Sequence, residues 1–326
     1  MRFVGQAEIA RRLPLELAIR IIEDGFAAYD PASWDIPVRS SLALDAAHKI
    51  VLTMPLLARN TGRIHTKTVL VHTGSDSPGQ AVATAVCAIW NASTGQLLLT
   101  ADGTYLTAVR TAATTGAAAR ALARPDSSCV ALIGAGYQGR MQALALRAVL
   151  PITRFEVVDI NAQRALALAE ELRQICGVEA ATASTLATAV AHADVVVTAT
   201  NSCKPVFPGN AIRPGTHVSS LGSYRTDMRE TDDDFIARAR IYVDAREHAW
   251  AEVGDLVTPL EHGIITRDAV VADLSELMRD RTLGRRSRSE ITFFKSAGFA
   301  LQDALLLEAL YVAVENDACA QKATAG

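Results

Sequence analysis

Near the start of the chain, apolar residues recur at helical spacing. Residues 8–29 (EIARRLPLELAIRIIEDGFAAY) place them every three or four positions, which is typical of an amphipathic helix that buries one face. Residues 105–123 (YLTAVRTAATTGAAARALA) are rich in alanine, and Pro125 marks where their helix should end. The sequence therefore predicts a helix at each place, the first one in spite of Pro14.

Between those helices the chain consists of short runs typical of β-strands, separated by turn residues. These runs predict a sheet of their own, whose last two strands are joined by Ser93-Thr94-Gly95. The runs are KIVLTMPLL (49–57), KTVLVHT (67–73), AVCAIWNA (85–92) and GQLLLTA (95–101).

Beyond Pro125 apolar strands alternate with helices, which indicates a parallel sheet covered on both faces. Residues 290–318 should add a short strand and a long closing helix. The predicted strands are CVALI (129–133), RFEVVDI (154–160), a short run near VEAAT (178–182), DVVVTAT (194–200), THVSSLG (216–222) and RIYVDA (240–245). The predicted helices are YQGRMQALALRAVL (137–150), NAQRALALAEELRQICG (161–177), TLATAVAHA (185–193) and DDDFIARA (232–239).

These elements predict an α/β protein with two domains, which suits a chain of 326 residues. Residues 121–302 should form a Rossmann-type, doubly wound parallel sheet. Residues 1–120 should form a second, α+β domain.

Composition and charge exclude several classes of protein. Half of the residues are hydrophobic, 21% are charged, and the net charge is -3, so no basic stripe suggests a nucleic-acid partner. Arg285, Arg286 and Arg288 are read as an exposed loop. No run reaches about 18 apolar residues without a charge, which argues against a membrane span. The five cysteines are far apart, which argues against disulfides and a zinc site; we expect a cytoplasmic protein.

Residues 134–139 (GAGYQG) fit the dinucleotide-binding pattern G-x-G-x-x-G. They follow an apolar strand and open a helix, which is the context the pattern requires. Gly134 should allow a tight turn, Gly136 should let the backbone approach a pyrophosphate, and Gly139 should allow close packing of helix on strand. The helix N-terminus would present N–H groups and its positive dipole end to the phosphates.

A carboxylate in the expected place favours NAD(H). Asp159 ends the next strand, 20 residues after Gly139, where it can accept the ribose hydroxyls and repel a 2'-phosphate. Arg164 lies close enough in sequence to keep NADP(H) open as an alternative.

Three cations, Arg39, Lys67 and Arg110, stand among β-rich or helical apolar neighbours. Lys67 lies in an alternating, half-buried strand, and Arg110 interrupts a helix of small residues. A buried, unpaired cation is costly, so each of these three side chains needs an anionic partner. Taken singly, each one could simply form a structural ion pair within the protein. Together they suit a small carboxylate substrate.

Several segments resemble the ornithine cyclodeaminase/mu-crystallin family, in the same order and along nearly the whole chain. They are RIHTKTVLVH, DGTYLTAVRTAATTGAAARALA, the glycine pattern, ADVVVTATNSCKPVF and ITFFKSAGFALQD. The resemblance implies a homodimer in which the N-terminal domain, completed by the C-terminal helix (about 303–326), binds substrate and forms the dimer.

The resemblance also implies roles for individual residues. Arg39, Lys67 and Arg110 match positions that bind the substrate carboxylate, and Lys67 is also placed to exchange a proton at the amine or imine. The matches to cofactor contacts are Tyr137, Gln138, Asp159, Thr200 and, beside the nicotinamide, Ser296.

The chain departs from the pattern of ornithine cyclodeaminases at two acidic positions. In the segment that should read G-G-D-x-P-G-K-T-E, residues 222–230 are GSYRTDMRE, so that Tyr224 replaces the aspartate and Asp227 comes three residues later. Asp227 is read as an N-cap or surface carboxylate. The acidic residue before the Met-Pro pair is also missing, since Leu52-Thr53 stand there.

Cyclodeamination needs groups that activate the side-chain amine, whereas reduction of an imine asks for less. The GSYRTDMRE form resembles the ketimine-reductase branch of the family. We therefore expect an NAD(P)H-dependent reductase of cyclic imino acids, such as delta-1-pyrroline-2-carboxylate or delta-1-piperideine-2-carboxylate, yielding L-proline or L-pipecolate. The alternatives, in order, are an alanine-type amino-acid dehydrogenase, an ornithine cyclodeaminase and a non-catalytic binding protein.

Overall fold

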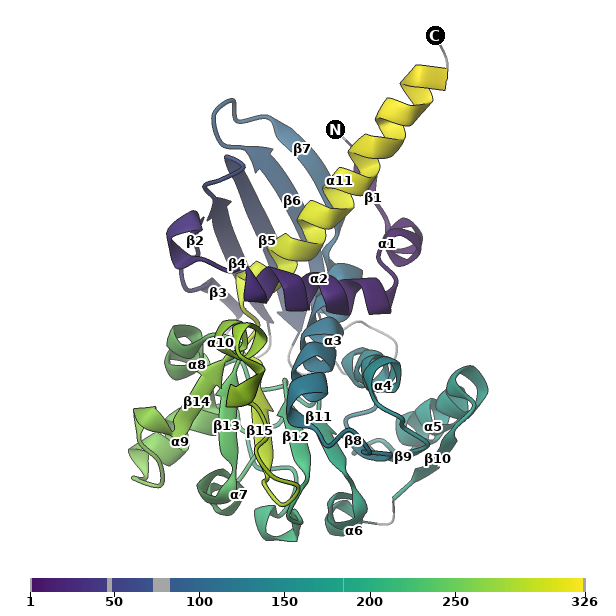
Figure 1. Ribbon diagram of the computed structural model, residues 1–326, viewed down its shortest axis with the longest axis vertical. Helices are drawn as coiled ribbons and strands as arrows, with labels where there is room; N and C mark the ends of the chain where they lie inside the picture. Colours follow the sequence, from purple (N-terminus) through teal and green to yellow (C-terminus); the bar gives the residue numbers. More distant parts are fainter. Residues whose placement is uncertain (1, 46–48, 73–82, 184, 325–326) are drawn as a thin grey trace. The chain divides into compact units, whose positions relative to one another are not determined.

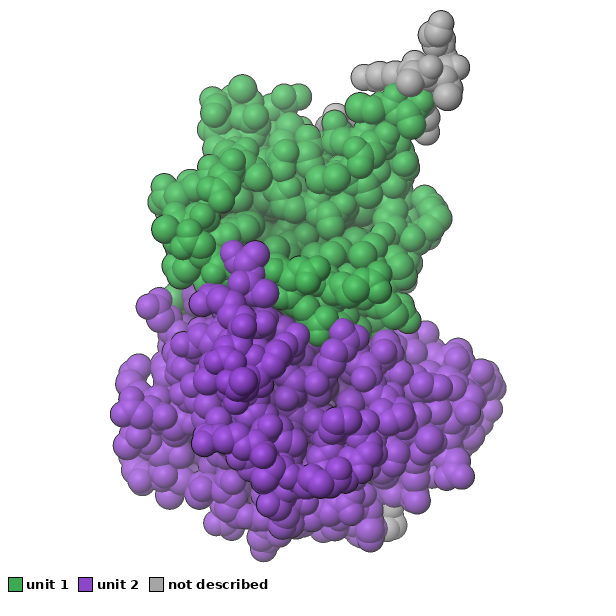
Figure 2. All heavy atoms as spheres, in the orientation of Figure 1, with its two compact units in different colours: residues 1–25, 29–110, 300–326 green, residues 26–28, 111–299 purple. Residues whose placement is uncertain are grey.

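The computed structural model describes residues 2–45, 49–72, 83–183 and 185–324 (Figure 1). The chain forms two compact units, coloured separately in Figure 2. Unit 1 comprises residues 1–25, 29–110 and 300–326, and unit 2 comprises residues 26–28 and 111–299. The division thus falls between residues 110 and 111 and between 299 and 300, where the sequence placed it after 120 and 302.

Unit 1 contains a seven-stranded, largely antiparallel sheet of order β1-β7-β6-β5-β4-β2, in which β3 also pairs with β4. Strands β4 to β7 are neighbours in chain order, as expected for runs separated by short turns. The strands are β1 (Phe3–Val4), β2 (Trp34–Asp35), β3 (Ser40–Asp45), β4 (Lys49–Ala58), β5 (Arg63–His72), β6 (Ala83–Asn91) and β7 (Leu97–Asp102). Thr73, the end of one predicted strand, lies outside the described residues.

This sheet has one buried face and one open face, because side chains alternate along each strand. Met54 and Leu56 on β4 are buried, while Thr53, Pro55 and Leu57, which alternate with them, are only partly covered. The buried face packs against α11 (Ala300–Thr324), which contributes Ala300 and Ala304 to the core and crosses the sheet in Figure 1.

The N-terminal segment contains the predicted amphipathic helix, but Pro14 divides it. The two helices are α1 (Gln6–Arg12) and α2 (Leu15–Ala27). Proline disfavours a helical conformation in the residue before it and lacks an N–H group, so Leu13 leaves the helix. The amphipathic helix expected within residues 8–29 is α2, and Pro14 separates it from α1.

Unit 2 is built on eight parallel strands in the order β10-β9-β8-β11-β12-β15-β13-β14. From the central β8 the chain proceeds to β9 and β10 on one side and to β11 and β12 on the other. This is the predicted doubly wound, Rossmann-type topology. The strands are β8 (Cys129–Ile133), β9 (Arg154–Val158), β10 (Glu179–Thr182), β11 (Val195–Thr198), β12 (His217–Ser220), β13 (Arg240–Val243), β14 (Val270–Asp273) and β15 (Thr292–Lys295).

Alternate residues of each strand enter two different cores. Val130 and Leu132 of β8 pack with residues of α3, α4 and α5, whereas Ala131 and Ile133 pack with residues of α6 to α9. Helices therefore cover both faces, and the central strands β8 and β11 are almost continuously apolar, as is typical of a buried parallel sheet. The helices are α3 (Gly103–Leu122), α4 (Tyr137–Val149), α5 (Ala162–Cys176), α6 (Leu186–His192), α7 (Asp233–Arg238), α8 (Arg246–Glu252), α9 (Gly254–Glu261) and α10 (Leu274–Arg279).

The arginine cluster near residue 285 is only partly the exposed loop that the sequence predicted. Arg288 is exposed and pairs with Asp126. The guanidinium of Arg285 is half-buried and donates hydrogen bonds to carbonyl oxygens that include those of Leu122 and Glu290. Arg285 therefore ties the end of α3 to the segment that precedes β15, and its side chain is structural. Among the described residues, no helix is both long and apolar enough to cross a membrane.

Candidate functional site

The buried face of the unit 1 sheet carries a compact ionic cluster. Lys67 on β5 is 2% exposed, and its Nζ donates to Asp303 Oδ2 on α11 at 2.6 Å. Arg110 lies in α3 with its Nε 3.2 Å from the other carboxylate oxygen of Asp303. The same guanidinium donates to Gln302 Oε1 at 2.6 Å. Two of the three predicted cations thus converge on one aspartate that the sequence did not single out.

A third cation and a thiol belong to the same neighbourhood. Arg39, half-buried just before β3, is close enough for its charge to lower the pKa of Asp303. Burial raises the pKa of the neighbouring Cys87 thiol to about 12, so that group stays neutral. Three cations thus gather around one carboxylate, an arrangement that suits a small anionic ligand.

Opposing effects set the protonation of the Lys67–Asp303 pair. Burial lowers the pKa of Lys67 to about 8, the charge of Arg110 acts in the same direction, and Asp303 opposes both. Burial alone would raise the pKa of Asp303, but Arg110 and Lys67 outweigh it and hold that pKa below its usual value. Lys67 is thus a cationic group that can release its proton near neutral pH.

A second set of ion pairs continues this arrangement along β5 and α11. Arg63 NH1 lies 2.6 Å and His65 Nε2 lies 2.8 Å from the carboxylate of Glu308. Because Arg63, His65 and Lys67 alternate along one face of the strand, they meet acidic residues spaced along the helix. A small pocket between sheet and helix is lined by residues that include His65, Lys67 and Asp303.

In unit 2 the glycines of residues 134–139 have the predicted geometry. Gly134 has a φ of +104°, and a Cβ there would lie 2.5 Å from the carbonyl oxygen of Ala199. A Cβ on Gly139 would overlap the carbonyl oxygen of Gly134, so helix and strand approach closely. A Cβ on Gly136 would meet nothing within 4 Å. Gly136 precedes α4, whose N-terminus no side chain caps.

Asp159 follows β9 beside this turn. Its carboxylate accepts hydrogen bonds from the backbone N–H groups of Ala135 at 2.7 Å and Asn161 at 2.8 Å. The aspartate is therefore held next to the glycine turn. Tyr137 is exposed on the first turn of α4, and the half-buried Gln138 has no hydrogen-bond partner for its Oε1 among the described residues.

Thr200 follows β11, the neighbour of β8, at the same edge of the sheet. Its backbone N–H and its hydroxyl both donate to Glu230 Oε1 at 2.8 Å. Glu230 is fully buried, and it was not among the residues selected from the sequence. The only hint in the sequence was that this acidic residue ends the GSYRTDMRE segment.

Ser296 follows β15 and is nearly buried. Its hydroxyl donates to Asp244 Oδ2 at 2.9 Å, and the same oxygen accepts the N–H of Gly298 at 2.8 Å. The turn after β15 is thus organised around Asp244, another buried carboxylate that the sequence analysis missed.

Asp227 lies on the surface, as the sequence analysis expected. Its side chain is 62% exposed and pairs with Arg225, whose Nε donates to Oδ1 at 2.8 Å. This hydrogen bond and the charge of Arg225 hold the pKa of Asp227 below its usual value. A carboxylate so occupied is poorly suited to replace the missing aspartate at position 224.

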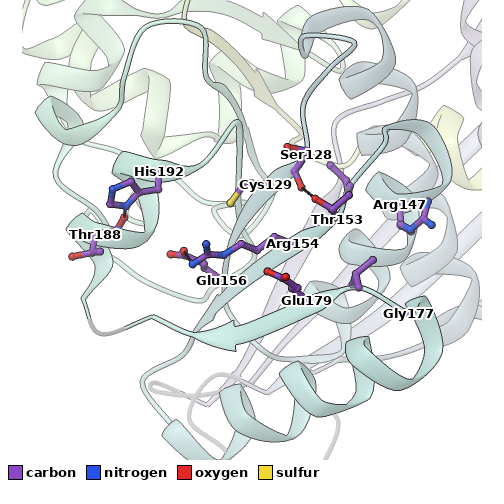
Figure 3. Close-up of a pocket in the computed structure, with 12 residues that line it drawn as sticks. Ser128, Cys129, Arg147, Thr153, Arg154, Glu156, Gly177, Glu179, Thr188 and His192 are labelled. Carbon is purple, nitrogen blue, oxygen red and sulfur yellow. Dashed lines mark hydrogen bonds and ion pairs between the residues drawn. The ribbon is translucent and has the colours of Figure 1, made fainter.

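A wide pocket of unit 2 lies elsewhere (Figure 3). Cys129, Arg154 and Glu179, which line it, begin β8, β9 and β10, so the pocket is at the amino ends of these parallel strands. The glycine turn is at their carboxyl ends, where open α/β sheets bind ligands. None of the predicted site residues lines this pocket. Among the described residues, no group of three or more His, Cys, Asp and Glu is arranged to hold a metal ion.

Comparison with known proteins assigns the chain to a family. The sequence profile of the ornithine cyclodeaminase/mu-crystallin family matches residues 2–317. The chain belongs to this family. Its ornithine cyclodeaminase/mu-crystallin fold extends over nearly all of the described residues, and the resemblance drawn from the sequence motifs is confirmed.

Relatives within the ornithine cyclodeaminase/mu-crystallin family include reductases. A delta(1)-pyrroline-2-carboxylate reductase of Paracoccus denitrificans is 37% identical over 249 residues, 76% of this chain and 78% of the relative. The structure of the Thermococcus litoralis delta(1)-pyrroline-2-carboxylate reductase with NADH and L-proline superposes with a TM-score of 0.92 at 30% identity, covering 97% and 98% of the two chains. An archaeal alanine dehydrogenase dimer with bound NAD superposes with a TM-score of 0.87 at 29% identity, covering 97% and 96%.

Proposed function

We propose that this chain is an NAD(P)H-dependent oxidoreductase that reduces cyclic imino acids, such as delta-1-pyrroline-2-carboxylate or delta-1-piperideine-2-carboxylate, to L-proline or L-pipecolate. The observation that carries the proposal is the buried cluster of Lys67, Arg110 and Asp303, which places a guanidinium beside a lysine whose pKa is about 8. The pyrroline-2-carboxylate reductases among the relatives support the same reaction.

The cations of the cluster bind the substrate carboxylate under this proposal. Arg110 presents a guanidinium that can hold a carboxylate with two hydrogen bonds, and Arg39 adds a second. Gln302 and Asp303 orient Arg110 before substrate arrives. A clamp prepared in this way holds the imino acid in one orientation, and such positioning supplies much of the rate.

Lys67 supplies the proton that the imine nitrogen needs. With a pKa near 8, the ammonium is largely protonated at neutral pH, yet it releases its proton more readily than an exposed lysine. Asp303 holds the ammonium at 2.6 Å and is the counter-ion that keeps Lys67 charged while buried. One proton and one hydride added across the C=N bond give the amine.

The residues around the glycine turn fit a nicotinamide dinucleotide. The space over Gly136 would admit a pyrophosphate, and the uncapped N-terminus of α4 would supply N–H donors. Tyr137, Gln138, Thr200 and Ser296 are the further contacts we propose. A bound NADH supplies the hydride for C2 of the imino acid.

Asp159 sets the proposed preference for NAD(H) over NADP(H). Its carboxylate is fixed by two backbone N–H groups and would repel a 2'-phosphate while accepting ribose hydroxyls. The NADH and NAD complexes of the two structural neighbours support this choice.

An alanine-type dehydrogenase is the second candidate, favoured by the structural similarity to the archaeal alanine dehydrogenase. It would use the same clamp on an open-chain amino acid. Ornithine cyclodeamination has less support, because Tyr224 replaces the expected aspartate and Asp227 is on the surface. A non-catalytic binding protein would need no buried lysine of lowered pKa.

The proposal includes a homodimer in the cytoplasm. The open face of the unit 1 sheet supports a dimer, because on β4, β5 and β6 its uncharged positions far outnumber the charged Lys49 at the start of β4, and all of them but the buried Ala88 remain partly accessible. These positions are Val51, Thr53, Pro55, Leu57, Ile64, Thr66, Thr68, Leu70, Thr84, Val86, Ala88 and Trp90. The five free cysteines support a reducing compartment.

A panel of substrates tests the reaction. Purified protein with NADH or NADPH receives delta-1-pyrroline-2-carboxylate, delta-1-piperideine-2-carboxylate, or pyruvate with ammonia, and ornithine with NAD+ is run in parallel. We expect oxidation of the reduced cofactor with the cyclic imines alone. Turnover with pyruvate and ammonia alone would favour the dehydrogenase, and proline formed from ornithine without net change in NADH would overturn the proposal.

A further inference from the structure

We propose that Glu230 is a positioning residue that holds the loops after β11 and β12 against the glycine turn, in the arrangement that dinucleotide binding requires. This inference rests on the proposed dinucleotide site and assigns a role to a residue that touches no reacting atom. The whole arrangement lies within unit 2.

The carboxylate of Glu230 joins two loops that follow neighbouring strands. Its Oε1 accepts the backbone N–H and the hydroxyl of Thr200, each at 2.8 Å. Its Oε2 accepts the hydroxyl of Ser220 and the backbone N–H of Gly222, also each at 2.8 Å. One fully buried side chain therefore ties the end of β11 to the end of β12.

These loops lie against the glycine turn. A Cβ on Gly134 would be 2.5 Å from the carbonyl oxygen of Ala199, the residue before Thr200. A Cβ on Gly222 would overlap the carbonyl oxygen of Thr200. Because the three backbones are this close, a shift of the Thr200 loop must alter the space beside Gly134.

Only a carboxylate satisfies this site. Four donors converge on the two oxygens of Glu230, and two of them, the backbone N–H groups of Thr200 and Gly222, can only donate, one to each oxygen. A glutamine in the same place would turn its NH2 group toward one of these N–H groups. The backbone N–H group of that loop would then lose its acceptor and meet another hydrogen-bond donor, which is costly in a buried site.

A buried lysine compensates the negative charge. Lys295 Nζ lies 3.9 Å from Glu230 Oε2, 3.1 Å from Asp255 Oδ2 and 2.9 Å from Ser220 Oγ. Asp255 in turn accepts the backbone N–H groups of Glu230 and Thr231 at 2.8 Å. The network fixes the segment that carries Glu230 and leaves its side chain one orientation.

The test compares Glu230→Gln with Glu156→Gln in the full-length protein. Glu156 is a buried carboxylate of the same unit, paired with Arg154 at the opposite edge of the sheet (Figure 3). NADH affinity is measured by the fluorescence of bound NADH, and melting temperature is measured alongside. We expect E230Q to weaken NADH binding about tenfold, which corresponds to about 1.4 kcal/mol, while E156Q leaves the affinity within about twofold of wild type.

The result that would overturn the proposal is an E230Q protein with wild-type NADH affinity, whatever its melting temperature. If E230Q does not fold, Ser220→Ala removes a single hydrogen bond to Glu230 and should still weaken NADH binding several-fold; unchanged binding by S220A also overturns it. A wild-type protein that binds NADH but reduces no imine would contradict only the proposed reaction. A wild-type protein that binds neither NADH nor NADPH would contradict both.

Discussion

Lys67 on β5 and Asp303 on α11 lie 2.6 Å apart although 236 positions separate them in the chain. The pair joins the sheet of unit 1 to the helix that closes its buried face. Arg110 approaches the second oxygen of the same carboxylate. Burial and the charge of Arg110 lower the pKa of the proposed proton donor, and a residue from the far end of the sequence, Asp303, opposes them.

The first prediction concerns the pH dependence of reduction. Lys67 must be protonated to donate, and its pKa is about 8, so kcat/KM for the cyclic imine should be constant below that pH and fall above it. Asp303 raises the pKa of Lys67, so Asp303→Asn should move the falling limb to lower pH. The measurement is a pH profile of kcat/KM at saturating NADH.

A matched control for that profile is Glu308→Gln. Glu308 is another carboxylate on α11, but it pairs with Arg63 and His65 and not with Lys67. E308Q should therefore keep the limb at the wild-type pH. A limb that stays in place in D303N as well would mean that Asp303 does not govern the titrating group.

The sequence predicted the features that depend on local pattern. The alternating strand around Lys67, the doubly wound sheet and the turn at Gly134 each follow from the order of a few neighbouring residues. The sequence also predicted that the buried cations would need anionic partners. The identity of the anion could not be derived, because Asp303 meets Lys67 only after the chain has folded.

Other misses have equally physical causes. The helices α8, α9 and α10 are six to eight residues long, too short for a clear helical period. The buried carboxylates Glu230 and Asp244 serve backbone N–H groups of distant loops, and no local spacing announces such a contact.

The second prediction concerns cofactor choice. Asp159→Ala should lower the ratio of kcat/KM for NADH to that for NADPH by about tenfold, since it removes the charge that would repel a 2'-phosphate. The ratio is the quantity to measure, because the loss of the hydrogen bond to Ala135 N–H will weaken both cofactors. Glu179→Ala, at the opposite edge of the sheet, is the control. An unchanged ratio in D159A would refute the role of this carboxylate.

The third prediction separates the glycines of residues 134–139. Gly136→Val should weaken NADH binding by about 100-fold or more, because the side chain would occupy the path of the pyrophosphate. Its melting temperature should stay close to wild type, since a Cβ there meets nothing within 4 Å. Gly139→Ala should instead lower the melting temperature, because its Cβ overlaps Gly134. NADH titrations and thermal melts read out both, and normal NADH affinity in G136V would contradict the proposed site.

The fourth prediction concerns assembly. Val86 on β6 is 46% exposed and lies opposite Thr68 on β5 in the open face of the unit 1 sheet. Val86→Glu places a charge where a dimer would bury it, so light scattering should change from twice the 34.7 kDa chain mass to a single chain. Val312→Glu, which replaces an exposed valine on α11, should leave the dimer intact. A V86E protein that remains dimeric would place the interface on another surface, because a desolvated glutamate without a partner could not be tolerated in this one.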